Sequence, residues 1–78
     1  MPTALRSGPY RLFFYSNENA EPPHIHIQRD EAVAKFWLRP VSLAGNVGFA
    51  SHELTRIRRI VTKYESHLMR AWHEFFGI

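Results

Sequence analysis

The chain has 78 residues, about half the usual length of a domain, so we expect one domain over residues 1–78. Its 45% hydrophobic and 14% aromatic residues exclude a disordered segment. The absence of cysteine excludes a disulfide scaffold, a thiolate zinc site and a cysteine nucleophile. The net charge of +3 is compatible with a polyanionic partner. No apolar stretch reaches the roughly 20 residues of a membrane span, so we expect a cytoplasmic protein with no membrane partner.

The first half of the chain has the composition of short β-strands separated by turns. Aromatic and β-branched runs alternate with Pro, Gly and Asn, and Ser7-Gly8-Pro9 is a strong turn signal. The strands are expected at residues 3–6, 10–15, 24–28 and 32–38, with a short fifth strand at 41–43. Pro40 is expected to end the fourth strand, because proline cannot donate to a ladder.

The third and fourth strands are expected to form a hairpin with a two-residue turn at Asp30-Glu31. Alternate residues of a strand point to opposite faces, so the register decides which side chains share the core. The favoured register pairs apolar residues on the core face, namely Ile25 with Phe36 and Ile27 with Ala34. On the other face it places His24 opposite Trp37 and His26 opposite Lys35.

From Ser51 the apolar period becomes helical and stays so almost to the end of the chain. Ser51 is the expected N-cap, Glu53 suits the first turn, and Gly77 is the expected stop. The apolar stripe consists of Leu54, Ile57, Val61, Tyr64, Leu68, Trp72 and Phe75. One long helix and two helices broken near residues 64–66 both fit, and the unbroken phase favours one. The predicted fold class is α+β: a small antiparallel sheet of four to five strands with one face covered by this C-terminal helix.

His24 and His26 are the most specific chemical feature. Because they alternate on a strand, both imidazoles project from one face. They could act as general base and acid in the cleavage of an RNA phosphodiester, with Lys35 and Arg11 stabilising the transition-state charge. The same pair could ligate zinc or nickel, although a metal site needs further ligands. The third interpretation is a polar pair on a solvated or partner-covered face.

The same face of the sheet is expected to carry aromatic rings. If Leu12 and Phe14 pack against the helix, their neighbours in the strand point outward. Phe13 and Tyr15 then lie beside Trp37 on the outer face. Clustered exposed aromatics mark a protein interface or a platform that stacks unpaired bases. We expect an interface, with a protein partner or self-association into a homo-oligomer favoured over nucleic acid.

A second stripe along the predicted helix is basic. Its members are His52, Arg56, Arg59, Lys63, His67 and Arg70. In a continuous helix they form a ridge about 27 Å long, at 1.5 Å per residue. Such a ridge could track the phosphates of RNA or DNA or meet an acidic partner, and the alternative is a solvated face. Phosphate-loop, dinucleotide-binding and zinc-protease motifs are absent from the sequence, so no cofactor is expected.

Two runs of the sequence are especially specific, Glu21-Pro22-Pro23-His24-Ile25-His26-Ile27 and Ala34-Lys35-Phe36-Trp37-Leu38. Four further runs accompany them: Met1-Pro2-Thr3, Phe13-Phe14-Tyr15-Ser16-Asn17-Glu18, Gly48-Phe49 and Trp72-His73-Glu74-Phe75-Phe76-Gly77. Together these runs resemble a bacterial family of unknown function, numbered 4160, over nearly the whole chain. The family pattern includes His24, His26, Lys35 and Trp37, the residues that the hairpin register gathers on one face.

The resemblance implies a small bacterial cytoplasmic protein without a settled activity. Members of the family are often encoded beside a second small family of unknown function, numbered 2442, and the pair looks like a toxin–antitoxin module. The expected role is therefore a toxin–antitoxin-type component with a small protein of family 2442 as its partner.

Three hypotheses for its activity remain open. The first is a metal-independent ribonuclease, in which Tyr15 or Trp37 stacks a base beside His24 and His26. The second is a non-enzymatic protein-interaction or nucleic-acid-binding regulatory module, and the third is a metal-binding domain through the two histidines. In the second hypothesis the nucleic-acid contacts come from Arg56, Arg59, Lys63 and Arg70.

Overall fold

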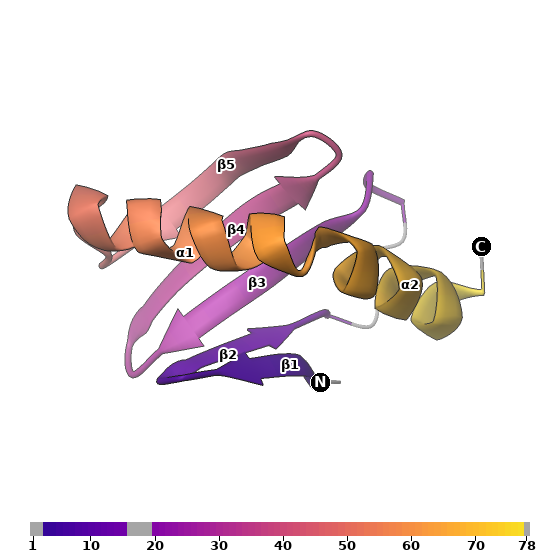
Figure 1. Cartoon of the computed structure of the whole chain (residues 1–78), viewed down its shortest axis with the longest axis horizontal. Helices are drawn as coiled ribbons and strands as arrows, with labels where there is room; N and C mark the ends of the chain where they lie inside the picture. Colours follow the sequence, from indigo (N-terminus) through magenta and orange to yellow (C-terminus); the bar gives the residue numbers. More distant parts are fainter. Residues whose placement is uncertain (1–2, 16–19, 78) are drawn as a thin grey trace.

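The computed structural model describes residues 3–15 and 20–77, which form five strands followed by two helices (Figure 1). The strands are β1 (Thr3–Ser7), β2 (Tyr10–Phe13), β3 (His24–Arg29), β4 (Ala32–Leu38) and β5 (Val41–Val47). The helices are α1 (Ser51–Lys63) and α2 (Glu65–Phe76). The strands form one antiparallel sheet in the order β1-β2-β3-β4-β5, and both helices lie on the same side of it. The predicted α+β class is confirmed.

The expected hairpin register is confirmed at every position that the sequence specified. Ile25 pairs with Phe36 and Ile27 with Ala34, while His24 pairs with Trp37 and His26 with Lys35. The strand β2 continues the same pattern, since Leu12 pairs with Ile27 and Phe13 with His26. The apolar residues of three neighbouring strands therefore face one side, where the helices bury them.

The core fills the space between the sheet and the two helices. Phe14 is buried there and its ring lies 5.5 Å from the ring of Trp72, so the expected inward direction of Phe14 is confirmed. Neither helix of the described chain is long and apolar enough to cross a membrane. The buried core consists of Tyr10, Leu12, Phe14, Ile25, Ile27, Ala34, Phe36, Leu38, Phe49, Ile57, Val61, Leu68, Met69 and Trp72.

The favoured single helix is wrong, because the helical segment is broken at Tyr64. Tyr64 has φ −105° and ψ 17°, and it serves as the C-cap of α1 and the N-cap of α2. A straight helix over residues 51–76 would be about 39 Å long at 1.5 Å per residue. The longest axis of the molecule is 34 Å. The break keeps both pieces on the sheet, with α1 packed along β5 and α2 against β1 and β4.

The start of α1 also differs from the prediction by one residue. Ala50 is the N-cap, in an extended conformation and without a side-chain cap bond, so Ser51 is already the first helical residue. The turn before the helix is held by Asn46, whose side chain bonds both the carbonyl and the N–H of Phe49. Phe49 is buried, and this anchor decides where the helix begins. The predicted stop at Gly77 is confirmed by its left-handed φ of 72°.

Several strand limits move by a few residues. The strand β2 ends at Phe13 rather than at residue 15, and β5 runs on to Val47 instead of ending at 43. The longer β5 contains an irregularity in its pairing with β4 between Lys35 and Phe36. Pro40 follows the end of β4 as expected.

Candidate functional site

The candidate site lies on the outer face of the sheet, opposite the helices. The strand alternation that buries Leu12, Ile25 and Phe36 turns their neighbours to this face. Six residues gather there, five from β2 to β4 and one, Tyr15, from just after β2. We name them the outer-face cluster: Phe13, Tyr15, His24, His26, Lys35 and Trp37.

His26 lies at the centre of the cluster. Its ring stacks on Phe13 at a centroid distance of 5.5 Å and meets the edge of Tyr15 at 4.6 Å. The ring of His24 approaches it edge-on at 5.2 Å. Only 7% of His26 remains exposed, because aromatic rings surround the imidazole.

His24 is fully buried, at 0% exposure. Its Nδ1 donates to the backbone carbonyl of Pro22 at 2.9 Å, and since a carbonyl only accepts, this nitrogen carries a proton. The ring also packs near two tryptophans, with centroid distances of 5.7 Å to Trp37 and 5.0 Å to Trp72 of α2. His24 therefore joins the outer face to the helix layer.

Lys35 is fixed at the edge of the cluster by two contacts. Its Nζ lies 2.6 Å from Oε1 of Glu21 and 4.7 Å from the centre of the Trp37 ring. The same Oε1 is 3.7 Å from Nδ1 of His24. Glu21 was not among the predicted site residues, because it precedes the strand and no periodicity marks it.

Arg11 lies on the same face of β2 as Phe13, two residues before it in the strand. Its Nε donates to Oγ1 of Thr3 at 2.9 Å, and its guanidinium lies 4.6 Å from the centre of the Phe13 ring. Since Phe13 pairs with His26, which pairs with Lys35, the two predicted cations flank His26 from opposite sides. The structure thus brings together all the outer-face residues that the sequence singled out, but the expected exposure of Phe13 is wrong, because only 1% of it is exposed.

The exposure of the cluster determines what it can do chemically. Tyr15 is 37% exposed, and Trp37, Lys35 and Arg11 are partly exposed, whereas His24 does not reach the surface. A general acid or base must touch the group to which it transfers a proton. Among residues 3–15 and 20–77, no group of three or more donor side chains could hold a metal ion.

The basic stripe is divided by the break between the helices. Arg56, Arg59 and Lys63 belong to α1, and Arg70 belongs to α2, so the expected continuous ridge is wrong. Within the described chain, Arg59 and Lys63 form no ion pair, and the acids Glu21, Glu53 and Glu65 pair with cations outside α1. The positive charges of Arg59 and Lys63 are therefore left to solvent or to a partner.

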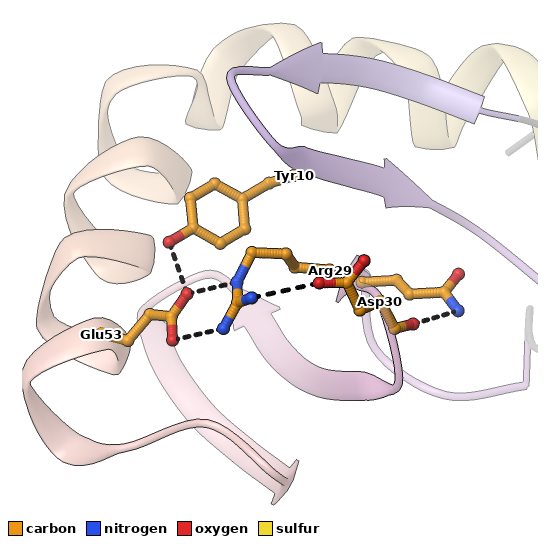
Figure 2. A network of polar contacts seen from close by, with 5 residues as sticks. Tyr10, Arg29, Asp30 and Glu53 are labelled. Atoms are coloured by element: carbon orange, nitrogen blue, oxygen red, sulfur yellow. Dashed lines mark hydrogen bonds and ion pairs between the residues drawn. The ribbon is translucent and has the colours of Figure 1, made fainter.

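A polar network at the start of α1 was missed by the sequence analysis (Figure 2). Oε2 of Glu53 accepts from Nε of Arg29 at 2.7 Å and from the hydroxyl of Tyr10 at 2.8 Å, and Oε1 accepts from Nη2 of Arg29 at 2.9 Å. These bonds, first of all those from Arg29, lower the pKa of Glu53. Burial, followed by the bond to Glu53, raises the pKa of Tyr10. A signal existed, since Arg29 alternates with Ile25 and Ile27 toward the helices.

The fold and the site define a small α+β domain in which helices cover one sheet face and a histidine-centred aromatic cluster occupies the other. The family model of a domain of unknown function (DUF4160) matches residues 10–73, and the chain belongs to this family. Neither the curated proteins nor the solved structures contain a match. Residues 1–2 and 16–18, which belong to two of the runs that carried the resemblance, lie outside the described residues.

Proposed function

We propose that the protein is a non-enzymatic binding module of a toxin–antitoxin-type pair, and that its small protein partner binds the outer face of the sheet. The contrast in exposure within the outer-face cluster carries this proposal. His24 is buried, whereas Tyr15 and Trp37 reach solvent. In this interpretation the imidazoles hold the aromatic rings in place and the accessible rings bind the partner. The pairing itself rests on the family resemblance.

The contacts of the cluster suit a protein interface. Trp, Tyr and Arg dominate the binding energy of interfaces. Trp and Tyr do so because they bury much area with few rotatable bonds. Lys35 is held over Trp37, and Arg11 is held over Phe13. Such fixed side chains lose little conformational entropy on binding. The outer face is thus organised before a partner arrives.

The partner surface is tested by titrating the protein with the small protein encoded beside it in a calorimeter. Tyr15→Ala/Trp37→Ala is expected to weaken binding at least about tenfold, because truncating hot-spot aromatics costs more than about 1.4 kcal/mol. Leu43→Ala is the matched control, since Leu43 is 40% exposed on β5 against 37% for Tyr15. Full affinity in the double variant would contradict the assignment of the surface. Absence of binding by the unaltered protein would contradict the pairing.

A metal-independent ribonuclease is the second candidate, and one arrangement favours it. The ring centroids of His24 and His26 lie 5.2 Å apart, and Lys35 pairs with His26 across the strands. An acid, a base and a cation therefore share one face. For this chemistry the side chains packed on His24, which include Trp37 and Trp72, would first have to move, because a buried imidazole cannot touch a phosphodiester.

RNA degradation in the presence of EDTA separates the two candidates. The non-enzymatic proposal expects no cleavage by the unaltered protein. Cleavage that is lost in His24→Ala/His26→Ala would overturn it and establish a ribonuclease. Truncating His24 removes a fully buried ring and is expected to cost about 2–4 kcal/mol of stability, so circular dichroism must accompany the assay. Lys35→Ala, on a partly exposed residue, provides a second variant that is expected to fold.

A further inference from the structure

A second candidate site lies on the helix side of the sheet, away from the outer-face cluster. An open pocket of about 290 Å³ lies between the edge strand β1 and the helix α2. Its volume is near the lower end of the roughly 300–1,000 Å³ of small-molecule sites, which suits one long side chain. Its lining residues are Thr3, Ala4, Phe14, Ala71, Glu74 and Phe75.

The walls of this pocket are mostly apolar. The rings of Phe14 and Phe75 are nearly parallel, with an interplanar angle of 22° and centroids 6.3 Å apart. Phe14 is buried, whereas Phe75 is 41% exposed. Ala4 and Ala71 contribute methyl groups from the strand and from the helix. Such walls favour an alkyl chain lying against aromatic rings.

Glu74 is the charged residue of the lining. Its side chain forms no ion pair with any residue that the structure describes, in contrast to Glu53 and Glu65. A carboxylate at the mouth of an apolar pocket attracts a cation and repels an anion. The exposed ring of Phe75 adds a face on which a cation can lie.

We propose that this pocket binds a lysine or arginine side chain presented by a partner protein. The alkyl stem lies against Phe14, Phe75 and Ala71, and the cationic head pairs with Glu74. The edge position of β1 leaves this side of the sheet without a further strand in the described chain, so an extended segment can reach the pocket. His67, whose Nε2 lies 3.3 Å from the carbonyl oxygen of Ala4, marks the neighbouring boundary between α2 and β1.

The inference is tested on the whole chain with Nα-acetyl-lysine methyl ester as the probe. Methyl and aromatic signals of Ala4, Ala71 and Phe75 are followed by NMR during the titration. We expect saturable shifts with the lysine ester, weaker ones with the norleucine ester, which keeps the alkyl stem but lacks the ammonium group, and none with the glutamate ester. No saturable shifts at these residues, up to the solubility limit of the lysine ester, would overturn the proposal.

Two variants of α2 distinguish a cation-binding pocket from a pocket that binds any apolar chain. Glu74→Gln is expected to weaken binding of the lysine ester about fivefold, as for a partly exposed ion pair, without changing norleucine binding. Ala71→Leu is expected to fill the pocket and abolish binding of both esters. Glu65→Gln, on the same helix but outside the lining, is the control. Equal affinities for the two esters, together with an inert Glu74→Gln, would overturn the cationic assignment.

Discussion

Glu53 is the residue that ties the start of α1 to the sheet. Its carboxylate bonds Tyr10 of β2 and Arg29 at the end of β3, which are 43 and 24 residues away along the chain. The Arg29 bonds use both carboxylate oxygens, which fixes the orientation of the helix as well as its position. A single acidic side chain thus connects three elements that are remote in sequence.

The stability of the fold is therefore expected to depend on the charge of Glu53. The bonds from Arg29 lower its pKa below the ordinary value of 4.5. Because the folded-state pKa is the lower one, the stabilisation is present above pH 4.5 and is lost as the pH falls through the folded-state pKa. Thermal unfolding followed by circular dichroism from neutral to acidic pH is the measurement.

Glu53→Gln is expected to lower the melting temperature at neutral pH and to flatten its decrease in acid. Glu31→Gln is the control, because Glu31 is exposed and forms no ion pair within the described chain. If the melting temperature of Glu53→Gln had the same pH dependence as that of the unaltered protein, other carboxylates would govern the loss of stability in acid.

At the scale of the element, the position of the α1 N-cap has a measurable consequence. Ala50 occupies the cap with φ −74° and ψ 159° and offers no side-chain oxygen to the first N–H groups. Ala50→Ser is expected to stabilise the protein by about 1 kcal/mol, because a serine at this position caps the helix. Ser51→Ala is expected to change stability by less than about 0.5 kcal/mol, since Ser51 is exposed and already helical.

Urea unfolding of the two variants measures both effects. If Ser51→Ala proved the more damaging change, the helix would begin one residue later in solution than in the structure. The comparison has an internal control, because both variants exchange the same two residue types at neighbouring positions.

At the scale of the whole molecule, the net charge of +3 is concentrated on one helix. The helix α1 carries Arg56, Arg58, Arg59 and Lys63, and the charge of its single acid, Glu53, is balanced by Arg29 of β3. Arg58 contacts the sheet, because its Nη1 donates to the carbonyl oxygen of Val41 at 3.1 Å. Like charges three and four residues apart weaken an isolated helix. An anionic partner would offset that cost.

Nucleic-acid binding through α1 predicts a definite salt dependence. Contacts from Arg56, Arg59 and Lys63 to three phosphates give a slope of about −2.7 for the logarithm of the association constant against the logarithm of salt concentration. Arg59→Ala is expected to reduce the slope by about 0.9. Arg6→Ala, an exposed cation on β1, is the control in fluorescence anisotropy with a short DNA duplex. Absence of DNA binding at low salt would contradict a nucleic-acid-binding role of α1.

The sequence determines some of these features and leaves others to packing. The β3–β4 register could be predicted because slipping by one residue puts Ile25 opposite Lys35, a conflict that the sequence itself shows. The break at Tyr64 could not, because one helix and two helices show the same apolar period, and only the packing of α1 on β5 and of α2 on β1 and β4 distinguishes them. The shared face of His24 and His26 follows from alternation. The burial of His24 does not, since its ring packs on Trp72, which is 48 residues away along the chain.

The strand order has a consequence for how the molecule folds. Each strand pairs with its neighbour in the chain, so the sheet can grow as a series of hairpins, each closing only a short loop. Domains dominated by such local contacts fold faster than sheets built from distant strands. The contacts that span the whole chain are made when α2 docks on β1 and on Phe14. We therefore expect the sheet to assemble early and the docking of α2 to complete the native state.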